Sequence, residues 1–274
     1  MKRNKGDEIE GGEEKIKVLC LKQASDEPKL SRISSGHGKQ GSELGVDQEA
    51  MDLPGIALPP SSPDSKAGVI FVLEKASLVL ANVGRRYRIL NANEHSDYLR
   101  KKNMDPYKYR PDIVHEALVG IMDSRLRMAG KLMAVYIKTD EGILIKVEPN
   151  ARIPRTLEEF CDMMAQLLQK LSIKAKAKGG KLLRLVQNPI TQYFPVNSIK
   201  IGLSFVSQKA VPVEEYISGV NKDSDLIFVV GTMAHGKIDT DYLDDLVAVS
   251  SYPLTAAACL RDISIALESK WKIH

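Results

Sequence analysis

Two apolar runs near the C-terminal end, each followed by a loop of small residues, are the part of this chain best suited to chemistry. Residues 226–236 read Leu-Ile-Phe-Val-Val-Gly-Thr-Met-Ala-His-Gly, and residues 246–254 read Leu-Val-Ala-Val-Ser-Ser-Tyr-Pro-Leu. A short continuous apolar run is typical of a strand buried on both faces. Strands that end at adjacent loops form the crevice in which α/β proteins bind ligands. The pattern predicts a small-molecule site in front of an apolar helix over 254–270, although two core strands with ordinary turns would give the same pattern.

These loops contain neither of the common phosphate-binding motifs. The first predicted strand, 68–74, is followed by Lys75-Ala-Ser-Leu rather than by a GxGxxG fingerprint, and no Walker sequence occurs. Gly231 and Gly236 lie instead in the last third of the chain, where they let the backbone approach a ligand closely. His235 is a tempting general base, but no carboxylate stands next to it, and a loop histidine more often makes local hydrogen bonds. We assign no catalytic residue in this loop.

A second set of candidate residues is basic. Arg110 precedes Pro111 and Asp112, which suit the first turn of a helix that we expect to stop at Gly130. Asp112 is placed to orient Arg110, or simply to favour the helix start. A solvated basic loop is the alternative interpretation of the arginines, and for an isolated arginine it would be preferred.

Two further arginines, Arg152 and Arg155, flank an Ile-Pro pair immediately before a second predicted helix. Thr156 and Glu159 have the spacing of a capping box, so this helix should begin after Thr156. Backbone N–H groups at a helix start favour phosphate, and guanidinium groups match phosphate oxygens better than lysine does.

The elements that must position these residues alternate between strand and helix. Strands are predicted over 68–74, within 76–90 around a turn at 82–84, and over 132–138, 143–147, 182–186 and 199–205, with helices from 111 and 156 and a short one near 213–217. This alternation favours an α/β fold with a mainly parallel sheet.

The chain of 274 residues divides into two parts by composition. Residues 1–66 contain no Phe, Tyr or Trp and carry a net charge of −2, whereas residues 67–274 carry 29 basic and 23 acidic side chains, a net of +6. Without large apolar side chains the first segment cannot offset its ordering entropy, so we predict a disordered tail over 1–66 and one folded domain over 67–274. A basic domain is compatible with a polyanionic partner.

The cysteines and the hydropathy restrict the environment of the protein. Cys20, Cys161 and Cys259 lie far apart without a CxxC pair, so neither a disulfide framework nor a metal site is predicted. The N-terminus is too charged for a signal peptide, and no apolar run approaches the ~20 residues needed to span a bilayer. We expect a soluble intracellular protein that binds no membrane.

Several motifs, in order along the chain, carry a resemblance. Arg110-Pro-Asp-Ile, Arg152-Ile-Pro-Arg-Thr, Asn188-Pro, Lys200-Ile-Gly-Leu-Ser-Phe, Phe228-Val-Val-Gly-Thr-Met-Ala-His-Gly-Lys and Val249-Ser-Ser-Tyr-Pro-Leu-Thr-Ala-Ala occur together. In this set the chain resembles the pseudouridine N1-methyltransferase family of small-subunit ribosome biogenesis, over about residues 68–274. The resemblance implies a SPOUT-type α/β knot, with a deep trefoil knot near the C-terminus that would be a rare exception to the rule against threaded chains.

The family also implies the ligands and partners. S-adenosylmethionine would be the cofactor, and a pseudouridine in the small-subunit (18S-type) precursor rRNA would be methylated at N1 during 40S biogenesis. The expected partners are a second copy of the chain and small-subunit assembly factors. The expected location is the nucleus, in the nucleolus. The residues carried over to the cofactor pocket are Leu203, Gly231, Gly236, Val249, Ser250, Ser251, Tyr252, Pro253 and Leu254, and those carried over to rRNA binding are Arg110, Asp112, Arg152 and Arg155.

The chain departs from the family at one position, and the sequence leaves two other functions possible. Relatives commonly have a third arginine where this chain has Glu159, and a carboxylate repels phosphate, so that contact is not carried over. A non-catalytic rRNA-binding assembly factor and a ribose 2′-O or guanine methyltransferase of the same fold class are the alternatives. We expect arginine charge to stabilise the anionic ring during transfer, with water or backbone accepting the proton.

Overall fold

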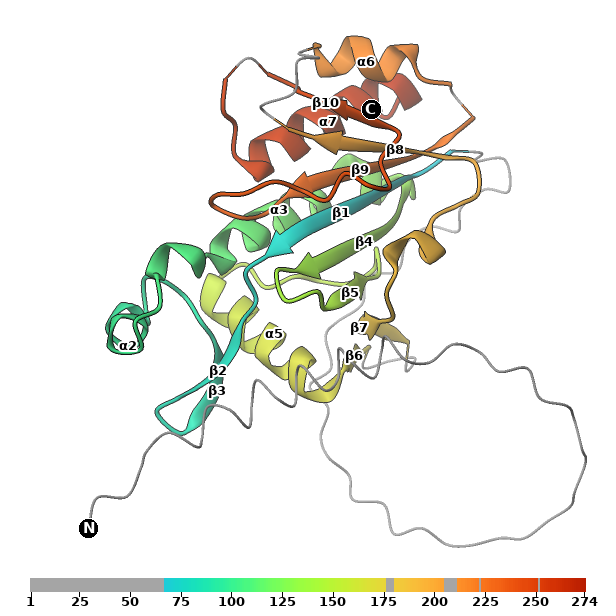
Figure 1. Cartoon of the computed structure of the whole chain (residues 1–274). Helices are drawn as coiled ribbons and strands as arrows, with labels where there is room; N and C mark the ends of the chain where they lie inside the picture. Colours follow the sequence, from blue (N-terminus) through green and yellow to red (C-terminus); the bar gives the residue numbers. More distant parts are fainter. Residues whose placement is uncertain (1–66, 176–179, 205–210, 222, 251) are drawn as a thin grey trace, which may run out of the picture.

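An eight-stranded sheet runs through the computed structural model, which describes residues 67–175, 180–204, 211–221, 223–250 and 252–274 (Figure 1). The strand order is β10-β8-β9-β1-β4-β5-β7-β6. The strands are β1 Val69–Ala76, β4 Leu132–Thr139, β5 Leu144–Val147, β6 Ser172–Lys174, β7 Lys181–Val186, β8 Ser198–Leu203, β9 Asp225–Gly231 and β10 Asp245–Val247. All pairs from β10 to β4 are parallel, and the pairs beyond β4 are antiparallel. The predicted α/β class with a mainly parallel sheet is confirmed, whereas the predicted tail over 1–66 lies outside the described residues.

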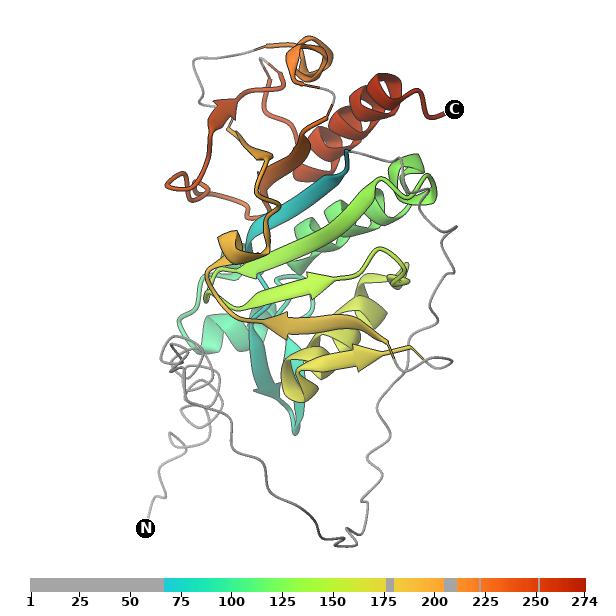
Figure 2. The same ribbon diagram turned by 90° about the vertical axis from the view of Figure 1, so that its right-hand side faces the viewer.

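Helices cover one face of this sheet (Figure 2). The helices are α2 Ser96–Lys101, α3 Pro111–Met122, α4 Arg125–Met128, α5 Leu157–Lys170, α6 Val213–Gly219 and α7 Ala256–Trp271, and the 3-10 turns are η1 Pro106–Lys108 and η2 Ile190–Tyr193. Helices α3 to α7 contribute buried side chains to the main core on this face. Alternate side chains of β1, among them Phe71 and Leu73, are buried in the main core with Leu118 of α3, Phe160 of α5 and Leu260 of α7. The period of two along the strand therefore determines which side chains meet the helices.

Loops rather than helices cover the opposite face. Ile70 and Val72, the intervening side chains of β1, pack in a second cluster with Ile190 of η2 and Ile238 of the loop after β9. β1 is consequently buried on both faces, as its continuous apolar run predicts. One side of the segment between β9 and β10 thus packs on the sheet, and its other side can face a ligand.

The helix that follows Arg155 begins where the sequence places it. Thr156 is the N-cap, and its hydroxyl oxygen accepts a hydrogen bond of 3.4 Å from the backbone N–H of Glu159. Apolar side chains at helical spacing, including Phe160 and Leu167, form its buried stripe. Glu159 therefore has a structural position at the helix start, on the exposed surface.

The helix predicted from Pro111 to Gly130 is wrong in its length. α3 ends at Met122, where the hydroxyl of Ser124 donates to the carbonyl of Ile121 at 2.7 Å, and the short helix α4 follows. A side-chain bond of this kind satisfies a carbonyl at the end of a helix and competes with its continuation. The backbone N–H of Arg125 then donates to Glu268 of α7 at 3.2 Å, which fixes α4 against the C-terminal helix.

Two strands differ from the prediction. β10 spans Asp245–Val247 alone, so most of the run 246–254 is loop rather than strand. β6, Ser172–Lys174, was not predicted, because a run this short with polar ends carries little strand signal.

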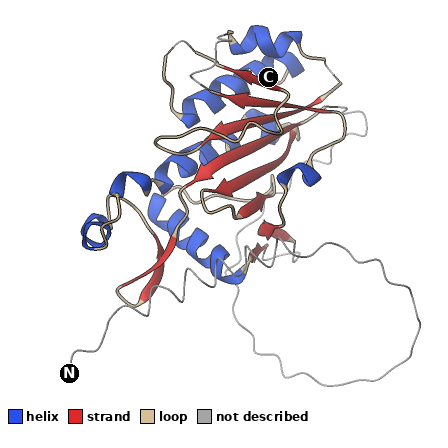
Figure 3. Cartoon of the chain, in the orientation of Figure 1, coloured by secondary structure: helices blue, strands red, loops and turns tan. Residues whose placement is uncertain are grey.

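A hairpin and α2 extend from one end of the sheet (Figure 3). The hairpin pairs β2, Leu80–Val83, with β3, Arg86–Ile89. Its turn is formed by Gly84 at φ +60° and Arg85 at φ +88°, so it begins later than the turn predicted at 82–84, whose first two residues belong to β2. Among the described residues, no helix has the length and apolar character required to cross a membrane.

Candidate active site

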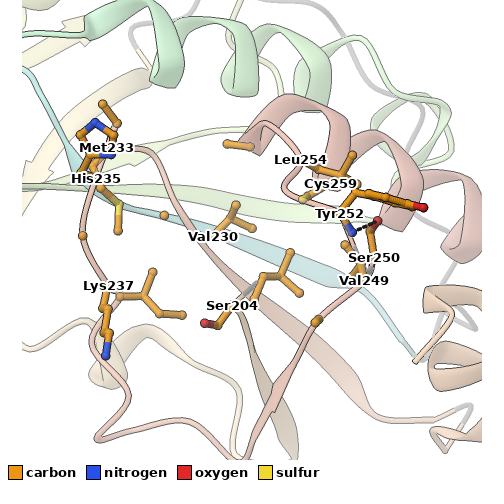
Figure 4. Close-up of a pocket in the computed structure, with 17 residues that line it drawn as sticks. Ser204, Val230, Met233, His235, Lys237, Val249, Ser250, Tyr252, Leu254 and Cys259 are labelled. Atoms are coloured by element: carbon orange, nitrogen blue, oxygen red, sulfur yellow. Dashed lines mark hydrogen bonds between the residues drawn. The ribbon is translucent and has the colours of Figure 1, made fainter. Parts of the chain in front are cut away.

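A cavity of about 420 Å³ lies at the carboxyl ends of β8, β9 and β10. β8 lies between β9 and β10, and all these pairs are parallel, so the loops after the three strands meet at one edge of the sheet. Figure 4 shows the loop with Met233 and His235 on one side and the loop with Val249 and Ser250 on the other. The crevice predicted from the two apolar runs is confirmed, with the addition of β8 between them.

Most of the predicted cofactor residues come together around this cavity. Those that line it are Leu203, Gly231, Gly236, Val249, Ser250, Tyr252 and Leu254. Pro253 is exposed and does not line the cavity, and Ser251 lies outside the described residues. Three stretches separated along the chain are therefore joined in one place, while the binding role of each residue stays a prediction.

The backbone around the cavity explains the two glycines. A Cβ at Gly231 would lie 2.7 Å from the sulfur of Met233, which itself lines the cavity. Gly236 has a φ of +141°, a conformation that is strained for residues with a side chain. On the facing loop, the hydroxyl of Ser250 accepts a hydrogen bond of 3.0 Å from the backbone N–H of Tyr252 (Figure 4). Gly231 therefore leaves room for Met233, and both glycines bring backbone to the cavity wall.

Sequence reasoning missed part of the lining. The additional residues are Ser204, Val230, Met233, Ala234, Lys237, Ile238, Ala248, Ala256 and Cys259, and His235, considered from the sequence only as a general base, also lines the cavity. Most are immediate neighbours of predicted residues, so their position in the sequence could have indicated them. Cys259 is different because it comes from α7, and burial raises the pKa of its thiol to about 11. A neutral thiol is a poor nucleophile, so Cys259 forms part of the wall.

Glu74, at the end of β1, anchors the loop between β9 and β10 and was not predicted. Its carboxylate is fully buried and accepts hydrogen bonds from the Tyr242 hydroxyl at 2.7 Å and the Asp239 backbone N–H at 2.8 Å. Lys138 of β4 lies 3.4 Å from the same carboxylate. The backbone carbonyl of Glu74 accepts from Thr232 N–H at 2.7 Å, immediately after β9. Both ends of the loop that lines the cavity are thus held by one residue.

The chemistry of Tyr242 strengthens this anchor. Burial, together with its hydrogen bond to Glu74, raises the pKa of the Tyr242 phenol well above its ordinary value. The phenol therefore stays protonated and donates to the carboxylate over the whole physiological pH range.

Arg110 lines a second cavity, of about 290 Å³, that shares residues 233–237 with the first. Its guanidinium donates to both oxygens of Asp112, from Nε at 2.9 and 3.0 Å and from Nη2 at 2.6 Å. The predicted orienting contact between Asp112 and Arg110 is confirmed. This pairing raises the pKa of Arg110, chiefly through the hydrogen bond to Asp112.

Arg152 and Arg155 line a third cavity, of about 260 Å³, which shares no residue with the other two. Both are exposed, and Arg155 forms an ion pair with Asp123 through both carboxylate oxygens. His115 of α3 hydrogen-bonds the carbonyl of Pro154 through Nε2 at 2.9 Å and so fixes the loop between the arginines. The predicted rRNA-binding residues therefore occupy two separate places.

Comparison with known proteins gives concordant matches. A family model described as EMG1/NEP1 methyltransferase matches residues 71–268. The ribosomal RNA small subunit methyltransferase NEP1 of Homo sapiens is 42% identical over 225 residues, covering 79% of this chain and 90% of that protein. The corresponding protein nep-1 of Caenorhabditis elegans is 40% identical over 210 residues, covering 77% and 90%.

A solved structure shares the fold. The crystal structure of Archaeoglobus fulgidus Nep1 bound to S-adenosylhomocysteine matches with a TM-score of 0.60 at 20% identity, covering 75% of this chain and 99% of that chain. At this identity the likeness concerns the fold, which is the SPOUT-type fold expected from the sequence. The trefoil threading of the C-terminal segment stays a prediction.

Proposed function

The chain belongs to the EMG1/NEP1 methyltransferase family, and from this we propose that it transfers the methyl group of S-adenosylmethionine to N1 of a pseudouridine in small-subunit rRNA. The observation that carries the proposal is the cavity at β8, β9 and β10, where three separate predicted stretches meet. The names of the relatives support small-subunit rRNA as the substrate. S-adenosylhomocysteine, present in the archaeal structure, is what S-adenosylmethionine becomes after it has donated its methyl group.

The residues present fit this cofactor. Apolar side chains such as Leu203, Val230 and Ile238 supply most of the wall, and Ser204 and Ser250 supply hydroxyl groups beside the loop backbone. Small-molecule sites combine mostly apolar walls with a few polar groups in volumes of ~300–1,000 Å³. The adenine of the cofactor suits the apolar part, and its sugar and amino-acid groups suit the hydroxyl and backbone groups.

The reaction requires alignment more than acid–base chemistry. When bound, S-adenosylmethionine supplies a methyl group already activated by its positively charged sulfur. In pseudouridine the sugar is attached through carbon, so N1 keeps a hydrogen. Transfer would join the methyl carbon to N1 as the bond from carbon to sulfur breaks, and the N1 proton would pass to water, which would balance the charge lost by the sulfur. The protein holds the two reactants in line, which can account for a large part of a barrier.

Arg110 is the side chain that we assign to the developing negative charge on the ring. Its cavity adjoins the cofactor cavity along residues 233–237, and Asp112 fixes its guanidinium. A preorganised cation next to developing charge stabilises a transition state without reorganisation. Arg152 and Arg155 line a cavity apart from both and are assigned to the RNA backbone.

Matched RNA substrates test the function. A small-subunit rRNA fragment carrying one pseudouridine is incubated with the protein and labelled S-adenosylmethionine, and the methyl group is mapped by mass spectrometry. The control is the same fragment with uridine, whose N1 is occupied by the sugar. We expect methylation of the pseudouridine RNA alone. Methylation of a ribose or a guanine, or cofactor binding without any transfer, would contradict the proposal in favour of the other enzyme class or of a pure assembly factor.

We also propose that the protein acts as a homodimer in the nucleolus, together with small-subunit assembly factors. Exposed apolar side chains that line the cofactor cavity support the dimer: Tyr252 is 77% exposed and Leu254 40%. A second copy seated there would remove them from water. Light scattering of the purified protein tests the dimer, and imaging of a fluorescent fusion tests the location.

A further inference from the structure

Arg127 of α4 is a buried arginine whose charge is not compensated. Only 3% of its surface is exposed. Two of its nitrogen atoms, Nε and Nη1, are buried without any hydrogen-bond partner, and Nη2 has the sulfur of Met128 at 3.6 Å. A buried guanidinium without a partner destabilises the folded state. Such a group needs an explanation other than packing, because an apolar side chain of similar length would pack without this cost.

Arg127 lines the same cavity as Arg152 and Arg155. The cavity lies where the end of α3, helix α4 and the loop before α5 meet, with apolar walls from residues such as Met122 and Ile153. A water molecule occupies ~30 Å³ in the liquid, so 260 Å³ holds one phosphate group and several waters. The site is therefore large enough for an anion and too polar to be merely a packing defect.

The charge of the cavity favours an anion. Three arginine residues line it against a single acidic residue, Asp123, whose carboxylate is already bound by both terminal nitrogens of Arg155. Within the described part of the chain, Arg152 forms no ion pair and Arg127 has no anionic partner. Phosphate oxygens accept charge-assisted hydrogen bonds from planar guanidinium groups with particularly good geometry.

We propose that Arg127, Arg152 and Arg155 form a phosphate-binding cavity for the rRNA backbone, in which the buried Arg127 provides the third arginine. This would offset the carboxylate of Glu159, at the position where relatives commonly have an arginine. The inference rests on the proposed function in one respect, that RNA is the substrate. The fixed loop between Arg152 and Arg155, held by His115, and the fixed helix α4, held by Glu268, would present the three groups in one arrangement.

The proposal predicts opposite effects on stability and on binding. In Arg127→Met, a side chain of similar length no longer buries a charge, so the melting temperature of the free protein should stay the same or rise. The dissociation constant for the pseudouridine-containing rRNA fragment should rise about 10- to 100-fold, as for the loss of a hydrogen bond to a charged group. The slope of log affinity against log salt should fall by about 1, because one fewer phosphate is neutralised.

Two other variants serve as controls for Arg127→Met. Arg125→Met is the control, because it also removes one positive charge from α4. Arg125 pairs with Glu268 and does not line the cavity, so the salt slope should not change in this variant. Arg152→Met, within the cavity, should lower both affinity and slope. Calorimetry with S-adenosylmethionine reports whether the fold and the cofactor cavity of each variant are intact.

The possible outcomes separate this inference from the proposed function. If Arg127→Met keeps wild-type affinity and salt slope while Arg152→Met loses both, the role of Arg127 is wrong and the proposed function stands. If the wild-type protein binds cofactor but does not bind or methylate the pseudouridine RNA, the proposed function itself fails. If Arg127→Met loses cofactor binding, Arg127→Lys is tested in place of Arg127→Met. A several-fold loss of RNA affinity in Arg127→Lys, with normal cofactor binding, supports the inference. Unchanged RNA affinity in Arg127→Lys overturns it.

Discussion

Replacing Glu74 should impair cofactor binding more than the loss of stability alone accounts for. Its carboxylate accepts from Tyr242 at 2.7 Å and from the Asp239 backbone at 2.8 Å, with Lys138 at 3.4 Å, in a fully buried position. Removing one partner of a buried charged network costs about 3–5 kcal/mol, which we expect for Glu74→Ala. Glu74→Gln keeps the size and one acceptor but turns an amide N–H₂ toward a donor, at about 1–3 kcal/mol.

These energies convert into measurable shifts. For a folded part of this size, each kcal/mol lowers the melting temperature by about 2–4 °C, so Glu74→Ala should lose about 6–20 °C. Glu74 holds the loop over residues 232–244, and residues 233–238 of this loop line the cavity. Part of the free energy lost in the variant should therefore destabilise the loop conformation that binds the cofactor, relative to other loop conformations of the folded protein. Each ~1.4 kcal/mol that does so raises the dissociation constant of S-adenosylmethionine about tenfold.

Thermal unfolding and calorimetry at a temperature where every variant is folded test this reasoning. Glu148→Gln is the matched control, because Glu148 bridges Lys146 at 3.0 Å and Arg184 at 2.9 Å without lining the cofactor cavity. It should cost about 1 kcal/mol and leave cofactor affinity unchanged. If Glu74→Ala bound S-adenosylmethionine as tightly as Glu148→Gln and the wild type, the anchoring role of Glu74 would be refuted.

Substitutions at three other positions should also have measurable effects on stability or on ligand binding. Asp112→Asn should change stability by less than about 1 kcal/mol, since the pair is partly exposed, yet it should lower RNA affinity by releasing Arg110; unfolding and RNA titration measure the two. Gly231→Ala should push Met233 into the cavity and weaken cofactor binding in calorimetry, with little effect on RNA binding. Burial raises the pKa of Cys259 from 9.0 to about 11, so the unfolded thiol ionises first and stability should fall as pH rises from about 9 to 11. Denaturant midpoints across that range should fall less steeply for Cys259→Ala.

Local patterns in the sequence were sufficient for most elements and for the cofactor loops. β1 and β9 are continuous apolar runs, and such runs belong to strands covered on both faces. The buried stripe of α5 and its Thr156 cap follow from helical spacing. Each of these signals lies within a few residues, where a side chain and its own backbone determine the result.

Pairings between distant residues could not be derived in this way. No local feature indicates that β8 lies between β9 and β10, because parallel neighbours are chosen by packing across the whole sheet. Glu74 is the polar end of an apolar strand, and its partner Tyr242 stands 168 residues later. The break after Met122 had a local signal in Ser124, but the apolar spacing continues through Leu126 and concealed it.

The separation of the arginines has a consequence for the kinetics. Arg110 lines a cavity that shares residues 233–237 with the cofactor cavity, whereas Arg127, Arg152 and Arg155 line one that shares none. A group that acts only on the RNA backbone binds substrate and transition state equally, and its loss raises the dissociation constant without slowing the bound complex. Arg152→Met should therefore keep the wild-type single-turnover rate at saturating RNA, while Arg110→Met should lower that rate as well as affinity. A fall in the saturated rate for Arg152→Met would mean that its charge also reaches the reacting ring, contrary to the distinct cavities.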